Sequence, residues 1–186
     1  MRCMFGCLSY GKSGCCPPNV PSVDECREFF ASYKSAVVFH LTKQVEKPED
    51  RILWSKETNK ELSKVERAVF LAGNYKVFLF FMDECRLCSK CAGGRMECRN
   101  PKQARPSPES FSVDVFATVR KMGYPIDVLT DYEKTMNRYA FLMIEWKSHL
   151  SNDGSFNRFI RRQASFHAAE QEPDIAKQET TSPESS

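Results

Sequence analysis

The sequence predicts an α/β domain with a sheet of about four strands, three main helices, two irregular cysteine loops and a disordered C-terminal tail. Apolar runs of strand length alternate with segments of helical periodicity, as in layered α/β domains. Eight of the nine cysteines fall within residues 3–16 and 85–98, which have neither periodicity. From about residue 151 the apolar pattern fails and the chain is polar. We therefore assign a cysteine-rich domain to 1–150 and a mostly disordered tail to 151–186.

The composition is that of a folded protein without a strong charge bias. Hydrophobic residues make up 41% of the 186 residues, enough to bury a core. The net charge of +3 is too small to favour nucleic acid or an anionic membrane as the main partner. No apolar run approaches the ~20 residues that span a bilayer, and the N-terminus lacks the regions of a secretory signal. We therefore expect a cytoplasmic protein that binds neither nucleic acid nor a membrane.

The first part of the chain predicts one helix and one strand. Residues 1–21 should form an irregular loop, because three prolines near its end exclude regular helix. The capping box at 22–25 starts a helix whose apolar residues share one face. The β-branched run at 36–39 predicts a short strand. Residues 43–56 are charged and contain Pro48, so a loop is expected there.

The middle of the chain predicts a helix followed by a buried strand. A second capping box at 58–61 begins a helix, and Gly73 is a natural residue to end it. The run at 75–82 is apolar almost without interruption, which is typical of a strand buried on both faces. This strand leads directly into Cys85, so it should position the second group of cysteines.

The last part of the domain predicts a third helix and two more strands. Residues 107–109 place serine at the N-cap and proline in the first turn, and Gly123 ends the helical pattern. Residues 126–129 and 139–146 are the remaining strand candidates. The alternation of these strands with the helices predicts layered α/β packing.

The cysteine content indicates metal ligation rather than a disulfide framework. Disulfides need an oxidising compartment, to which nothing in the sequence directs the chain. Nine is also an odd number, and a chain of this length can bury a core without covalent cross-links. Thiolates in a reducing compartment are ligands for zinc and for iron–sulfur clusters. The candidate ligands are Cys3, Cys7, Cys16, Cys85, Cys88, Cys91 and Cys98.

The sharpest signal lies in the second cysteine loop (residues 85–105), where Cys85-x2-Cys88-x2-Cys91 is followed by Cys98. Three cysteines at this spacing let a short loop contact three corners of a compact object, which suits a 4Fe-4S cluster. Zinc sites more often combine one C-x2-C pair with a distant second pair. The ligand count fits either metal, so we favour an iron–sulfur cluster and keep zinc as the alternative. The six-residue gap makes Cys98 either the fourth ligand or part of a second site.

The first cysteine loop (residues 1–21) offers Cys3, Cys7 and Cys16 as further ligands. If the two loops meet in space, these thiols either complete a second metal site or close the first. Cys15 and Cys26 are expected to be bystanders. Cys26 lies on the apolar face of the first helix, where a free cysteine packs as a small hydrophobe.

Basic residues surround the second cysteine loop and favour an anionic group there. Between residues 85 and 106, six basic residues stand against the single acid Glu97. Cations lower the pKa of nearby thiols and suit an anionic cluster. We expect Arg99, Arg105 and Glu109 to bind a cofactor or substrate beside the metal. The alternatives are docking of an acidic partner on this loop and a plain salt bridge between Arg105 and Glu109.

A set of motifs gives the sequence a family resemblance over about residues 3–145. It combines a Cys-Pro-Pro segment, the cysteine triplet and an Arg-Pro-Ser-x-Glu segment. The motifs are Cys3-x3-Cys7-x2-Tyr10-Gly11-Lys12, Cys16-Pro17-Pro18-Asn19-Val20-Pro21, Cys85-x2-Cys88-x2-Cys91 and Cys98-Arg99-x-Pro101-x3-Arg105-Pro106-Ser107-x-Glu109. With these motifs the sequence resembles the uncharacterised family of predicted metal-binding proteins, domain of unknown function 2284. The resemblance implies metal or cluster binding by these cysteines and no particular activity.

The sequence therefore predicts a cysteine-ligated metal-binding protein. We expect an iron–sulfur cluster that serves electron transfer or supports another enzyme as a redox accessory, with a redox protein as partner. A structural zinc-binding interaction module is one alternative. A cluster-dependent redox enzyme, with its substrate near Arg105 and Glu109, is the other. No Ser-His-Asp arrangement or carboxylate pair identifies catalytic residues.

Overall fold

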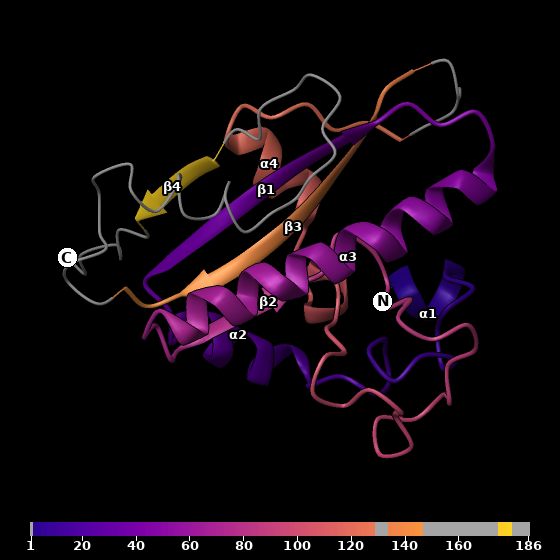
Figure 1. Ribbon diagram of the computed structural model, residues 1–186, viewed down its shortest axis with the longest axis horizontal. Coiled ribbons are helices and arrows are strands. Elements are labelled where there is room, and N and C mark those ends of the chain that lie inside the picture. The colour runs from indigo at the N-terminus through magenta and orange to yellow at the C-terminus, as the bar shows by residue number, and fades with distance from the viewer. Residues whose placement is uncertain (1, 129–133, 147–174, 180–186) are drawn as a thin grey trace.

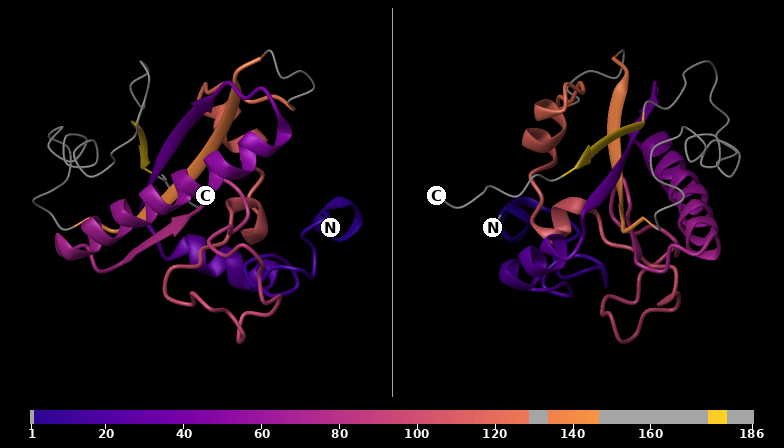
Figure 2. Two further views of the ribbon diagram at one scale, coloured as in Figure 1. Left: turned by 45° about the vertical axis from the view of Figure 1, so that its right-hand side comes forward. Right: turned by 90° about the vertical axis from the view of Figure 1, so that its left-hand side faces the viewer.

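The computed structural model describes residues 2–128, 134–146 and 175–179 of the chain. A central antiparallel sheet lies between two layers of helices (Figure 1, Figure 2). The long helix α3 (Pro48–Leu71) covers one face of the sheet. Helices α2 (Val23–Ala31) and α4 (Val115–Lys121) cover the other face. The mixed α/β class expected from the sequence is confirmed.

Three antiparallel strands build the sheet within residues 2–146, in the order β2-β3-β1. Phe141 of the middle strand pairs with Val38 of β1 and with Phe80 of β2. A further strand, which the sequence did not predict, pairs with the other edge of β1 and is the only described part of the predicted tail. The strands are β1 (Ser35–Lys43), β2 (Val77–Phe80), β3 (Met136–Ile144) and β4 (Ile175–Glu179).

The strand expected at 126–129 is wrong. Residues 126–128 form no strand, and residue 129 lies outside the described residues. Ile126 is buried in the core on the α4 side of the sheet, and its carbonyl accepts a hydrogen bond from Arg120 Nη2 at 3.0 Å. This carbonyl therefore binds a helix side chain instead of a neighbouring strand. A short apolar run cannot by itself be told from such a packed loop.

One predicted helix start is confirmed and another is wrong. Ser22 and Glu25 form the predicted capping box of α2, with hydrogen bonds of 3.3 and 2.8 Å between side chains and backbone N–H groups. Helix α3 begins at Pro48, well before the predicted start at residue 58, so the expected loop at 43–56 is wrong from Pro48 onward. Proline fits the first turn of a helix, because its missing N–H would have no intrahelical partner there.

The helix expected from residue 107 onward is divided in two. Ser107 caps a short 3₁₀ helix, η1 (Pro108–Phe111), as predicted. Ser112 then adopts a left-handed backbone conformation with φ of 66°, and the helix ends. Helix α4 begins afterwards with Asp114 as its N-cap. The propensities of this segment predict helix, but the backbone turn at Ser112 separates the two pieces.

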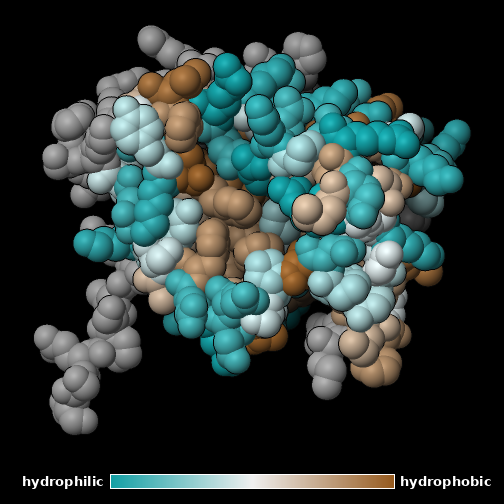
Figure 3. All heavy atoms as spheres, turned by 90° about the horizontal axis from the view of Figure 1, so that it is seen from below, coloured by the Kyte–Doolittle hydropathy of each residue, from teal (hydrophilic) through white to brown (hydrophobic). Residues whose placement is uncertain are grey.

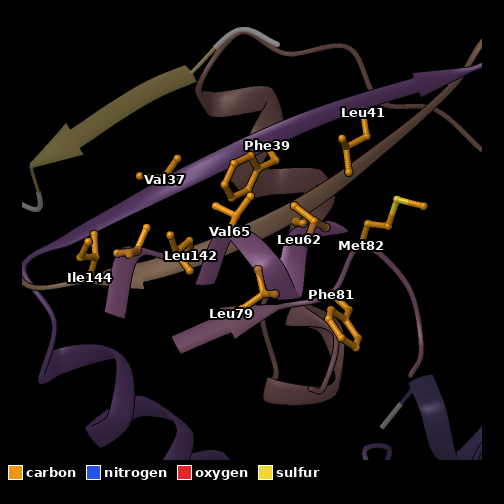
Figure 4. Close-up of a cluster of buried hydrophobic side chains, with 12 residues drawn as sticks. Val37, Phe39, Leu41, Leu62, Val65, Leu79, Phe81, Met82, Leu142 and Ile144 are labelled. Carbon is orange, nitrogen blue, oxygen red and sulfur yellow. The ribbon is translucent and has the colours of Figure 1, made fainter. Parts of the chain in front are cut away.

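Two cores hold the sheet between its helix layers. On one face, side chains such as Leu62 and Val65 of α3 point toward those of all three strands (Figure 4). On the opposite face the core is aromatic, with Phe80 of β2 and Phe111 of η1 in edge-to-face contact at 5.1 Å. The residues of the first core that have no exposed surface are Val37, Phe39, Leu62, Val69, Leu79, Phe81, Ala140, Leu142 and Ile144.

Strand β2 leads from this packed frame into the second cysteine loop below the sheet (Figure 1). The first cysteine loop contains α1 (Arg2–Gly6), so the expectation of a wholly irregular loop is wrong for these residues. Seen from below, the surface is hollowed near its centre, where apolar residues are bordered by hydrophilic ones (Figure 3). None of the helices in the described part of the chain has the length and hydrophobicity that a membrane span requires.

Candidate metal centre

The two cysteine loops touch each other through a side-chain hydrogen bond and a close approach of their backbones. Asn19 Nδ2 donates a hydrogen bond to the Gly93 carbonyl oxygen at 3.0 Å. Gly14 approaches the second loop so closely that a Cβ atom on it would lie 2.7 Å from the Gly94 carbonyl oxygen. Only glycine permits this approach, because it has no side chain. The loops therefore meet in space, as a metal site shared between them requires.

A direct contact between two thiols joins the loops. Cys15 is buried, Cys85 is half-buried, and their side chains share a hydrogen bond. That bond lowers the pKa of Cys85, and the N–H groups of Leu87 and Arg105 act in the same direction against the effect of burial. The same bond and burial raise the pKa of Cys15. The Cys15 S–H thus donates a hydrogen bond that favours the thiolate form of Cys85, and thiolate is the form of cysteine that ligates metals.

The three predicted ligands of the first cysteine loop differ in exposure. Cys16 is buried, and desolvation raises the pKa of its thiol to about 11 despite hydrogen bonds with Ser13 and Ser110. Cys3 is half-buried and Cys7 is exposed, at the end of α1. Of these three thiols, only Cys16 is enclosed by the protein.

In the second cysteine loop three thiols are half-buried and one is exposed. Cys98 lies near enough to Cys15 that its charge raises the pKa of Cys15. Asn100 Nδ2 donates a hydrogen bond to Cys88 Sγ at 3.0 Å, and donors to sulfur tune bound metals. Cys91 is exposed. The structure therefore brings Cys15 and Cys85 together between the loops and leaves Cys91 at the surface.

The donor chemistry fits a thiolate-bound metal, although the side chains are not at ligand distance. All nine cysteines are free thiols, so the disulfide framework is absent. Within residues 2–128, 134–146 and 175–179, no three His, Cys, Asp or Glu side chains are grouped closely enough to hold a metal ion. A metal held by three or more of these thiols would require them to lie closer together than they do here. Gly93, with φ of 97°, gives the second loop a conformation open to few other residues.

Two of the basic residues in the second cysteine loop, Arg86 and Arg95, have definite partners. Arg86 forms an ion pair with Glu84, which also accepts a hydrogen bond from Ser9 of the first loop. Arg95 donates to the Pro101 carbonyl at 3.0 Å, and its charge lowers the pKa of Cys85. The direction of this effect agrees with the expectation that cations in this loop favour thiolate.

The alternative of a plain salt bridge between Arg105 and Glu109 is wrong. Arg105 binds Glu66 instead, with Nη2 and Nε 2.9 and 3.0 Å from the two carboxylate oxygens. Glu109 is exposed on η1, yet protein packed around its carboxyl raises its pKa by desolvation. Arg99 is exposed as well. Binding of a cofactor or substrate by Arg99, Arg105 and Glu109 stays a prediction.

A family described as predicted metal-binding protein, DUF2284, matches residues 1–144. The chain belongs to the DUF2284 family. No curated protein and no solved structure matches the chain. All nine cysteines of this DUF2284 protein lie inside the matched range, so both loops are part of the family region. The family description supports metal binding and does not specify the metal.

Cys15 of this DUF2284 protein is the residue that spacing along the chain does not single out. It neighbours Cys16, which the sequence favours as the ligand through its Cys-Pro-Pro motif, so the sequence predicts Cys15 to be a bystander. The backbone turns Cys15 toward Cys85 and leaves Cys16 beside Ser13. Cys26, in contrast, lies in the aromatic core with 1% exposure, as its place on the apolar helix face predicts.

Proposed function

We propose that this DUF2284 protein binds a metal centre through thiolates of both cysteine loops. The observation that carries this proposal is the packing of the two loops, in which Asn19 Nδ2 lies 3.0 Å from the Gly93 carbonyl oxygen and Gly14 lies against Gly94. Cys15 and Cys85, one thiol from each loop, interact at this contact. Cys98 lies nearby, and Asn100 donates a hydrogen bond to the Cys88 sulfur. Thiols gathered from distant parts of a chain are expensive to desolvate unless they serve as ligands or pack as apolar groups.

We infer an iron–sulfur cluster, rather than zinc, from the supply of ligands. Cys85, Cys88 and Cys91 at two-residue spacing suit three corners of a 4Fe-4S cluster. With thiols from the first loop available as well, the protein offers more ligands than one tetrahedral zinc ion accepts. The charge of Arg95, which lowers the pKa of Cys85, also suits the negative charge of a cluster bound by thiolates.

The role that this arrangement favours is electron transfer or redox support of another enzyme. A cluster, when bound, supplies one-electron redox chemistry. The chain itself would shield one side of the centre with buried Cys15 and bring Cys91 to the surface on the other. Lys90 and Arg99, both exposed in the same loop, favour a redox partner protein with an acidic docking surface.

Anaerobic purification followed by iron, sulfide and zinc analysis tests the proposal. We expect about four iron and four acid-labile sulfide per chain, with visible absorption that bleaches on reduction. Stoichiometric zinc without sulfide would overturn the cluster and the redox role. A protein that retains no metal under these conditions would overturn metal binding altogether.

Cysteine variants test which thiols hold the metal. Cys85→Ala and Cys15→Ala are both expected to lose most of the bound metal, because each removes one side of the contact between the loops. Cys26→Ala is the matched control, since this buried thiol packs in the core away from both cysteine groups. Circular dichroism of each variant checks that the fold persists. Equal metal loss in the Cys26 variant would contradict the assignment of ligands.

A further inference from the structure

A cleft with a volume of about 760 Å³ lies beside the proposed metal centre. Its walls come from the C-terminal half of α3, the start of β2 and the end of the second cysteine loop. Its volume is that of a small-molecule site. No cysteine lines it, but Asn100, which donates a hydrogen bond to the Cys88 sulfur, forms part of its wall.

The cleft is strongly cationic. Five basic side chains and one carboxylate line it. Arg105 neutralises Glu66, and Lys64 pairs with Glu61 outside the cleft at 2.7 Å. Three cations of the lining have no ion pair among the described residues, and each is exposed. These three are Lys60, Arg67 and Lys102.

The three cations come from two different walls. Lys60 and Arg67 are seven residues apart on α3, a spacing that places them on one face of a helix two turns apart. Lys102 belongs to the second cysteine loop. Positive charge from two walls attracts a ligand with several negative charges more strongly than a single surface lysine does.

The far end of the cleft is aromatic. Phe70 and Tyr75, at the turn between α3 and β2, form an edge-to-face pair with ring centroids 5.5 Å apart. Phe70 is 46% exposed and Tyr75 is 68% exposed, so both rings offer surface to a ligand. Val77 and Leu87 add apolar surface to the lining. Aromatic surface of this kind stacks on flat rings, as it does on nucleic acid bases.

We propose that this cleft binds a phosphorylated compound with a flat ring, that is, a nucleotide. The phosphates lie against Lys60, Arg67 and Lys102, and the ring lies against Phe70 and Tyr75. Bound there, the nucleotide contacts the loop that carries Cys88 through Asn100. This ligand site is separate from the thiols and does not depend on the metal.

Isothermal titration of the full chain, purified with its metal, tests the proposal with ADP and pyrophosphate as probes. We expect ADP to bind at least tenfold more tightly than pyrophosphate, because only ADP engages the aromatic end. A triple variant should bind ADP at least tenfold more weakly. Its substitutions are Lys60→Gln, Arg67→Gln and Lys102→Gln. Lys43→Gln, at the exposed end of β1, removes one positive charge away from the cleft and should leave the affinity unchanged. Each of the three cleft substitutions made singly is compared with this control.

Phe70→Ala separates the two halves of the site. This substitution should weaken the binding of ADP at least fivefold and leave the binding of pyrophosphate unchanged. No ADP binding at millimolar concentration would overturn the proposal, as would equal affinities for the two probes or an unchanged affinity in the triple variant. Metal content is measured in every variant and is expected to stay constant, so failure here is distinct from failure of the metal site.

Discussion

Glu66 of α3 and Arg105 of the second cysteine loop form a two-point ion pair, with contacts of 2.9 and 3.0 Å. Glu66 Oε1 also accepts the Leu79 N–H at 2.9 Å, so the same carboxylate covers a backbone donor on β2. Strand β2 is the edge of the sheet, and its outer N–H groups need such partners. One carboxylate thus fixes the loop, the helix and the edge strand relative to one another.

Arg105→Gln should lower the free energy of unfolding by about 2–4 kcal/mol, because Glu66 is buried and would lose its counter-charge. Urea unfolding provides the measurement. Lys64→Gln is the control: it breaks an exposed ion pair with Glu61 and should cost less than about 1 kcal/mol. Equal losses in the two variants would contradict a structural role for the buried pair.

Gly14→Ala should separate the two cysteine loops. Its Cβ would lie 2.7 Å from the Gly94 carbonyl oxygen, so we expect a loss of about 1–3 kcal/mol in unfolding free energy and a lower metal content. Gly6→Ala is the control, because a Cβ at Gly6 meets no atom within 4 Å. Unchanged metal content in the Gly14 variant would show that the close approach is not needed for binding.

Leu62→Ala should destabilise the protein by about 2–5 kcal/mol, since this side chain is completely buried between α3 and the sheet. Leu53, on the same helix, is 58% exposed, and Leu53→Ala should stay within about 0.5 kcal/mol of the wild type. Thermal and urea unfolding compare the two. A smaller loss at Leu62 than at Leu53 would contradict the observed orientation of α3.

Glu109→Gln should change the pH dependence of stability. The folded-state pKa of Glu109 is raised by desolvation, so folding favours its protonated form. The stability that protonated Glu109 contributes is fully present below its unfolded-state pKa and is lost as the pH rises through its folded-state pKa. The free energy of unfolding of the variant should therefore equal that of the wild type in acid and exceed it toward neutral pH. Urea unfolding at several pH values provides the measurement. A relative gain toward low pH instead would contradict the raised pKa.

The sequence predicts those parts of the fold that are decided by residues close together along the chain, such as helix caps. The capping box at Ser22 and Glu25 marks the start of α2, because both of its hydrogen bonds form within one turn. Ser107 caps η1 through a hydrogen bond within one turn, and Gly73 follows the end of α3 with a positive φ that favours glycine. The apolar run before Cys85 predicts a strand because burial on both faces demands it.

The errors occur where distant contacts decide the structure. Pro48 can end a helix or begin one, and the charged segment around it gives no preference, so the extra turns of α3 are missed. Ser112 breaks the third helix through a backbone conformation that its side chain does not signal. The contact of Cys15 with Cys85 depends on how two loops pack, which spacing along the chain cannot encode.

X-ray absorption at the iron and zinc edges of the anaerobically purified chain tests the shared metal centre most directly. Iron with an all-sulfur first shell and neighbouring iron atoms is the expected result. Cys15→Ala should lower the iron content and reduce the sulfur coordination of the iron that remains bound. A first shell of nitrogen and oxygen, or sulfur coordination that is the same without Cys15, would contradict a centre held by both loops.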